Sequence, residues 1–217
     1  MSKHSFDTVY FCYNFIEKYF LRDYQVALKL IRLHLNLKKN QNVVDVGGGT
    51  GFIANSIINK VDSVTVVDLS KQMLMRSKSP IITTIQGNGS SIPFKDGVFD
   101  IALLINVLHH MKKTEQDNVL KETFRVLKNQ GEAFIMDLFF PKGFFNSIFK
   151  KFEEIAVGKT YHLPHNEVMA KLKNIGFHDI SLAFPDERHW RYLVIAKKTN
   201  KNNNVKKLHP SNKTGKK

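Results

Sequence analysis

Glycines and a carboxylate lie together in one short stretch of the chain, residues 45–51. The stretch contains Asp45, Gly47, Gly48, Gly49 and Gly51. It follows an apolar run typical of a buried strand, and a helical pattern begins at residue 52. A strand, a glycine turn and a helix in this order bring backbone N–H groups and a helix N-terminus to one edge of a sheet. Glycine also lets a ligand approach the backbone closely and allows positive φ angles.

A second carboxylate, Asp68, stands 21 residues after Gly47 at the end of another apolar run. A carboxylate at this place can accept hydrogen bonds from both hydroxyls of a ribose. A dinucleotide site would also need a third glycine, where this chain has Phe52. The pattern therefore argues against NAD or FAD and leaves the motif D-x-G-x-G-x-G over residues 45–51.

Histidines form the third group that could do chemistry. His109 and His110 follow the apolar run 99–105, and Tyr161, His162 and His165 lie in a linker that could close over a site. A histidine at the carboxyl edge of a sheet can take a proton from a reacting group. A structural role for these histidines stays open. The single cysteine, Cys12, excludes an internal disulfide and is expected to pack in a helix.

Strands and helices alternate along the middle of the chain, which is the arrangement that would position these groups. Strands are expected at 43–46, 63–68, 81–86, 99–105 and 132–140, and helices at 50–59, 71–77 and 114–127. Ser70 is expected to cap the helix that begins at residue 71. This alternation predicts an α/β fold with a doubly wound, mostly parallel seven-stranded sheet and helices on both faces. Strands at 179–184 and 190–196 are close enough to pair antiparallel, so the last strand is expected to be antiparallel.

The flanking segments predict one domain over residues 1–198. Residues 6–37 read as two helices broken near residues 21–23, which form an N-terminal helical cap over 1–37. Residues 141–165 form an aromatic insertion with a helix at 144–157, and another helix follows at 165–175. The tail 199–217 is rich in Lys and nearly devoid of apolar residues, so we expect it to be disordered.

The net charge of +14 is concentrated at the C-terminus. Residues 197–217 contain eight lysines and no acid, which leaves +6 for the rest of the chain. A solvated tail explains this charge, and transient contact with RNA or an anionic membrane surface is the alternative. No apolar run is long enough to span a membrane, and the N-terminus has no apolar signal region. We therefore expect a cytoplasmic protein.

The motifs together resemble the class I S-adenosylmethionine-dependent methyltransferases. Residues 45–51 resemble the first motif of that family, and 66–74, 86–100, 107–111 and 122–131 are similar to its later segments, in the right order. The resemblance covers about residues 40–140, and the branch it resembles includes the quinone-biosynthesis C-methyltransferases.

The resemblance implies S-adenosylmethionine as the cofactor. Gly47, Gly49 and Gly51 would pass under the methionine and ribose, and Asp45 would support the loop or the ammonium group. By the same resemblance, Leu69 and Met73 would flank the adenine, Asn88 would accept a hydrogen bond from its amino group, and His109 or His110 would lie near the donor. No metal is implied.

The methyl acceptor is expected to be a small aromatic or apolar molecule, because the segments outside the nucleotide half are rich in aromatic residues. Phenylalanines at 139, 140, 144, 145, 149 and 152 could line a pocket or meet a membrane surface, and core packing explains them equally well. RNA is the alternative acceptor. Methylation of a base amine is disfavoured, because Asn106 is not followed by the two prolines of that motif. The third hypothesis is a non-catalytic, methyltransferase-like partner subunit.

Overall fold

The computed structural model describes residues 24–77, 79–139, 158–185 and 191–199. Within these ranges seven strands form one sheet in the order β3-β2-β1-β4-β5-β7-β6. The strands are β1 (Asn42–Val46), β2 (Ser63–Asp68), β3 (Thr83–Gln86), β4 (Phe99–Ile105), β5 (Leu127–Leu138), β6 (Phe177–Ala183) and β7 (Arg191–Lys198). The helices are a helical stretch at 24–34, α2 (Phe52–Ile57), η1 (Ile58–Lys60), α3 (Lys71–Leu74), η2 (Leu108–His110), α4 (Lys113–Val126) and α6 (His165–Ile175).

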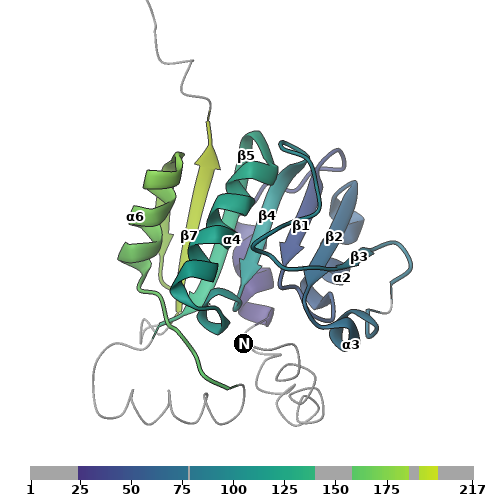
Figure 1. Cartoon of the computed structure of the whole chain (residues 1–217). Helices are drawn as coiled ribbons and strands as arrows, with labels where there is room; N and C mark the ends of the chain where they lie inside the picture. The colour runs from purple at the N-terminus through teal and green to yellow at the C-terminus, as the bar shows by residue number, and fades with distance from the viewer. Residues whose placement is uncertain (1–23, 78, 140–157, 186–190, 200–217) are drawn as a thin grey trace, which may run out of the picture.

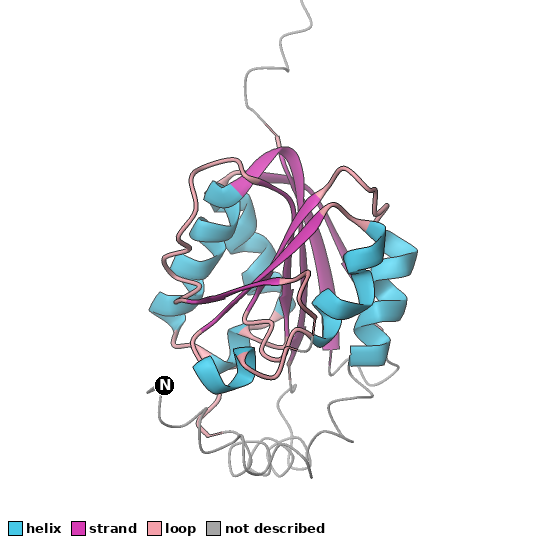
Figure 2. Ribbon diagram, turned by 90° about the vertical axis from the view of Figure 1, so that its right-hand side faces the viewer, coloured by secondary structure: helices cyan, strands magenta, loops and turns pink. Residues whose placement is uncertain are grey.

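The sheet is the middle layer of three. β1 pairs parallel with β2 and β4, and β5 extends the parallel part, whereas β7 is antiparallel to both β5 and β6 (Figure 1). Helices cover both faces, as the view along the sheet shows (Figure 2). The predicted fold class is therefore confirmed, including the antiparallel last strand.

The alternation of side chains in the strands explains why both faces are covered. In β1, Val44 and Val46 belong to one apolar core and Val43 to the other, and all three are buried. The first core also includes side chains from α4 and α6, and the second includes side chains from residues 27–35 and α2. A strand that is apolar on both faces needs cover on both, which a crossover helix after each parallel strand provides.

Some predicted boundaries differ from the structure. The helix expected at 50–59 is divided into α2 and η1, and β5 begins at Leu127 instead of residue 132. Leu127 already pairs with Phe99, and the register then shifts around Gln130, whose φ is +67°. Gly131 has no room for a side chain, because an added methyl carbon would lie 2.9 Å from the Lys128 carbonyl oxygen. This irregular start of β5 leaves no period-two pattern in the sequence from which it could be predicted.

Other boundaries agree closely. Helix α6 has the predicted bounds and ends at Gly176, whose φ of +118° closes the helix. The Ser70 hydroxyl accepts a hydrogen bond from the Met73 amide, so the predicted cap of α3 is confirmed. The helix predicted at 144–157, most of the first predicted helix, Cys12 and the tail lie outside the described residues. None of the described helices is long and apolar enough to cross a membrane.

Candidate active site

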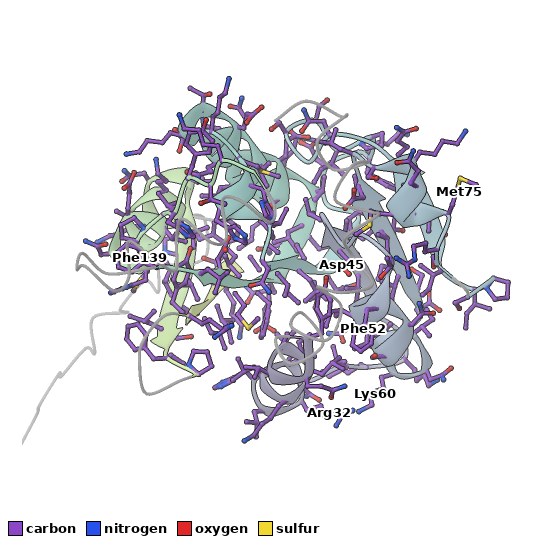
Figure 3. All side chains as sticks on the ribbon, turned by 90° about the horizontal axis from the view of Figure 1, so that it is seen from below. Arg32, Asp45, Phe52, Lys60, Met75 and Phe139 are labelled. Carbon is purple, nitrogen blue, oxygen red and sulfur yellow. The ribbon has the colours of Figure 1, made fainter. Side chains whose placement is uncertain are left out.

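The predicted site residues meet where β1 and β4 end. β1 lies between β2 and β4 in the sheet, so the chain order reverses at this point, and ligands of open α/β sheets generally bind beyond the carboxyl ends of the strands at such a point. Figure 3 looks onto the side where the parallel strands end, with Asp45 and Phe52 on the half formed by β1–β3 and Phe139 on the other half.

The glycine loop after β1 has no room for side chains. Gly47 has a φ of +72° and donates its N–H to the Val67 carbonyl oxygen at 2.7 Å. A methyl carbon added at Gly47 would lie 2.2 Å from Val107 Cγ2. Gly49 and Gly51 have φ angles of +56° and +71°. A side chain at Gly47 is therefore excluded by contact, and the positive φ angles of Gly49 and Gly51 favour glycine there, so the backbone is bare at these positions.

Asp45 lies beneath this loop and is 2% exposed. A methyl carbon added at Gly48 would lie 2.5 Å from the Asp45 carboxyl carbon, so the carboxyl group rests directly against the loop. Among the described residues its Oδ2 has no hydrogen-bond partner. Burial, and secondly the charge of Asp68, together raise the pKa of Asp45 to about 7.

Asp68 ends β2, and its carboxylate connects the glycine loop to the turn that precedes α3. Its Oδ2 accepts a hydrogen bond from the Gly49 amide at 2.9 Å, and its Oδ1 accepts one from the Ser70 amide at 2.8 Å. Burial raises the pKa of Asp68, and these two backbone N–H groups partly oppose the rise. Each carboxylate oxygen has further lone pairs, so both can also accept from a ligand hydroxyl.

The residues predicted to surround an adenine also lie on this half. A methyl carbon added at Gly49 would lie 3.3 Å from Met73 Cε, so Met73 reaches the loop. Leu69 follows Asp68 and is 37% exposed. The Asn88 Oδ1 accepts a hydrogen bond from the Ser90 amide at 2.9 Å, which fixes its own turn. One lone pair of that oxygen is therefore already used within the protein.

The second half of the site contains a buried contact between Asp137 and His109 that was not predicted from the sequence. The Asp137 carboxylate at the end of β5 contacts His109 twice, through Oδ1 to the ring Nδ1 and through Oδ2 to the backbone N–H at 3.2 Å. Both residues are 1% exposed. Contact at two points fixes the rotation of the imidazole ring and places the Nδ1 proton toward the carboxylate.

Residues 160–162 cover this pair. The Tyr161 amide donates to the His109 carbonyl oxygen at 2.7 Å, and His162 Nδ1 lies 3.1 Å from the Leu138 carbonyl oxygen. The His162 ring stacks on the His109 ring with 5.6 Å between centroids and 6° between planes. The linker predicted to close over the site therefore does lie against it at Tyr161 and His162. His165 instead begins α6 and packs against Phe184.

His110 is held in the neutral state. Its ring lies 4.0 Å from that of His109, between centroids. Burial is the largest cause that lowers the pKa of His110 well below its usual value, and the charges of His109 and His162 lower it further. The two histidines that the sequence left equivalent are therefore in different electrostatic environments.

Asn106 is the second residue that the sequence reasoning missed as a site residue. It follows β4 directly, has a φ of +53°, and donates its backbone N–H to the Met136 carbonyl oxygen at 2.8 Å. The signal for both missed residues was the same: a single polar side chain at the end of an apolar strand. Asp137 follows the run Ala133–Met136, and Asn106 follows β4.

A model of the methyltransferase domain family matches residues 44–135 of the chain. Among curated proteins, the ubiquinone/menaquinone biosynthesis C-methyltransferase of Erwinia tasmaniensis is 29% identical over 148 residues, 62% of this chain and 56% of that protein. The protein of the same name from Xylella fastidiosa strain M12 is 31% identical over 112 residues, 46% of this chain and 44% of that protein. The chain thus spans about half the length of the curated relatives it matches.

Solved structures agree on the fold. A methyltransferase of Thermotoga maritima, described as a possible histamine N-methyltransferase, has a TM-score of 0.69 at 21% identity, with 86% of this chain and 95% of that chain covered. A phosphoethanolamine N-methyltransferase of Haemonchus contortus in complex with S-adenosyl-L-methionine has a TM-score of 0.68 at 19% identity, with 81% and 52% covered.

Together these matches confirm the predicted resemblance. Residues 44–135 match the methyltransferase domain family, part of the chain is similar to the quinone C-methyltransferases, and the chain shares the fold of solved methyltransferases, all of which support the resemblance to the class I S-adenosylmethionine-dependent type.

Proposed function

We propose that the protein transfers a methyl group from S-adenosylmethionine to a hydroxylated aromatic acceptor of the quinol type. The observation that carries the donor assignment is the bare cradle of Gly47, Gly49 and Gly51 between two carboxylates, Asp45 and Asp68. The similarity to the quinone C-methyltransferases supports the acceptor class. When bound, the donor supplies an electrophilic methyl group on a cationic sulfur.

Each chemical group of this donor has residues of the chain that could bind it. Asp68 would accept hydrogen bonds from the ribose hydroxyls, and Asp45 would face the positive charge of the amino-acid end through its unpartnered oxygen. Leu69 and Met73 would flank the adenine, and Asn88 would accept from the adenine amino group through its second lone pair. The glycine backbone, including Gly48, would lie under the remaining parts.

The test of the donor site is calorimetry with S-adenosylmethionine on the wild type and on Asp68→Ala. We expect wild-type binding, with an affinity about 10- to 100-fold weaker in Asp68→Ala, because two hydrogen bonds to a charged acceptor are lost. Asp62→Ala, in the turn before β2, is the control and should bind as the wild type does. Wild-type protein that is folded but does not bind at millimolar donor would refute the proposed function.

We also propose that His109, and not His110, receives the proton that the acceptor loses. The acceptor atom would form its bond to the methyl carbon while the carbon–sulfur bond breaks, so that S-adenosylhomocysteine leaves with the electron pair. The acceptor would then release one proton, which would pass to His109 Nε2. The Asp137 carboxylate stabilises the resulting imidazolium, as a buried partner does in hydrolase triads. The surroundings of His110 instead lower its pKa, which disfavours the uptake of a proton by its ring.

Glutamine variants of the two histidines separate these roles. We expect His109→Gln to lower the methyl-transfer rate by roughly 10²- to 10⁴-fold, the usual contribution of a general base, with donor affinity kept. His110→Gln should reduce the rate much less. Single-turnover rates on acceptors of the quinol type, with donor affinity from calorimetry as the folding control, make the comparison. A greater loss in His110→Gln would contradict the assignment.

The phenylalanines that were predicted to line an acceptor pocket or to meet a membrane surface lie outside the described residues, with the exception of Phe139. Phe139 is half-buried and packs against the core on the β5 side. The acceptor class therefore depends on the relatives and on the polar groups of the second half of the site.

A further inference from the structure

Asn106 departs from ordinary protein geometry in two ways at once. Its φ of +53° lies in the left-handed region, which is uncommon for a residue with a side chain. Both polar atoms of its side chain, Oδ1 and Nδ2, are buried and have no hydrogen-bond partner within the described part of the chain. Asn adopts this backbone region more readily than most residues, but a buried amide without a partner costs free energy, and such a cost persists where a function requires the arrangement.

The position of Asn106 places it between the two halves of the site. The residue before it, Ile105, pairs with Met136 in β5, one residue before Asp137. The residue after it, Val107, packs against Gly47 in the glycine loop. Asn106 therefore stands at the point where the strand order reverses, next to the loop on one side and to the Asp137–His109 pair on the other.

The groups assigned to the donor all come from the first half. Asp45, Asp68, Leu69, Met73 and Asn88 belong to β1, to β2 and to the segments after β2 and β3. Asn106 is bonded through its backbone to β5 instead. A ligand group that meets its amide is thus expected to belong to the second molecule in the site, the methyl acceptor.

The chemistry of the amide narrows that group. A carboxamide offers a carbonyl oxygen that accepts and an NH₂ group that donates. A hydroxyl group both donates and accepts, so it can pair with either the Oδ1 or the Nδ2 of Asn106. A ligand with a hydroxyl beside a carbonyl oxygen can pair with both atoms. A purely apolar group would leave the amide as unpaired as it is in the free protein.

We propose that the Asn106 side chain binds a hydroxyl group of the methyl acceptor and thereby selects hydroxylated aromatic acceptors. This inference rests on the proposed function and adds to it a specificity-determining residue. Binding would supply the partner that the buried amide lacks, and would hold the acceptor between the donor and His109.

The experiment uses two probes, 1-naphthol and its methyl ether 1-methoxynaphthalene, which keeps the oxygen but cannot donate a hydrogen bond. Both are titrated into the full chain, free and saturated with S-adenosylhomocysteine. We expect the wild type to bind 1-naphthol about 10- to 100-fold more tightly than its methyl ether, because only the hydroxyl both donates and accepts. Asn106→Gly keeps the positive φ and removes the amide, so it should lose this preference.

The controls separate the possible failures. Asn36→Gly, at an exposed position in a loop, should keep the wild-type preference. Equal binding of the two probes by the wild type, or a preference that Asn106→Gly retains, would overturn the inference. So would a loss of S-adenosylhomocysteine affinity in Asn106→Gly, because the amide would then serve the donor. Failure of the proposed function shows itself differently, as a wild type that does not bind the donor.

Discussion

Asp45 shows how one buried carboxyl group can couple donor binding to pH. Its pKa is raised to about 7 by burial first and by the charge of Asp68 second. In the unfolded chain the group has an ordinary pKa, so the folded state binds the proton more tightly than the unfolded state does. The stability that this group contributes is therefore complete below about pH 4 and is lost as the pH rises through 7.

A cationic donor reverses this balance, because it favours the charged form of Asp45. We predict that the affinity for S-adenosylmethionine rises between about pH 6 and pH 8, and that binding near pH 7 releases a proton. Calorimetry in two buffers of different ionisation enthalpy measures the released proton directly. Asp45→Asn should bind with little dependence on pH in this range. An affinity of the wild type that is constant from pH 6 to 8 would contradict the prediction.

At the residue scale, the sequence predicted which residue types lie in the candidate site, but not their pKa values or their partners. The motif at 45–51 and Asp68 predicted the two carboxylates and the loop between them. Nothing in the sequence distinguished His109 from His110, because the difference comes from Asp137, 28 residues later in the chain. A pKa depends on which groups fold against it, and neighbours in sequence are a poor guide to those groups.

At the scale of the elements, helix α4 is held to the sheet by a lysine from the last strand. The Lys198 ammonium donates to the carbonyl oxygens of Phe124 and Leu127, each at 2.7 Å, and lies 4.7 Å from the Phe124 ring centroid. A cation at the C-terminus of a helix satisfies carbonyl groups that have no partner in the helix and is favoured by the helix dipole. Burial lowers the pKa of Lys198, which limits the stability that this ammonium group contributes.

We predict that Lys198→Met lowers the free energy of unfolding by about 1–2 kcal/mol, because hydrogen bonds from a charged donor to the helix end are lost while the aliphatic stem is kept. Urea unfolding at pH 7 measures the difference. Lys197→Met is the matched control: Lys197 makes a partly exposed ion pair with Glu132 at 3.3 Å, and its loss should cost no more than about 0.5 kcal/mol. Equal effects of the two substitutions would show that Lys198 does not stabilise the end of α4.

The elements themselves were predicted well where the pattern was continuous. β2, β4 and α6 have the predicted bounds, because each has a clear apolar period and a definite end. The start of β5 was missed, since Gln130 and Gly131 adopt their conformations to fit the backbone of β4 and the end of α4. That constraint arises only when the strands pair.

At the scale of the whole molecule, the site exists because the chain order of the sheet reverses between β1 and β4. The glycine loop comes from β1, Asn106 and His109 follow β4, and Asp137 ends β5. These residues span about 90 positions of the chain, yet they meet because the carboxyl ends of parallel strands share one edge. Residues 160–162 then return to the same edge from beyond the β5 end and cover the histidine pair.

The sequence by itself determined the fold class and predicted the half of the candidate site that is proposed to hold the donor, because the motif at 45–51 and the carboxylate at Asp68 are local patterns on consecutive strands. Only the tertiary structure decided the second half. The pairing of Asp137 with His109, the neutral state of His110 and the unpartnered amide of Asn106 depend on contacts between distant strands. Local patterns encode backbone geometry, whereas burial and charge pairing are set only when the sheet is assembled.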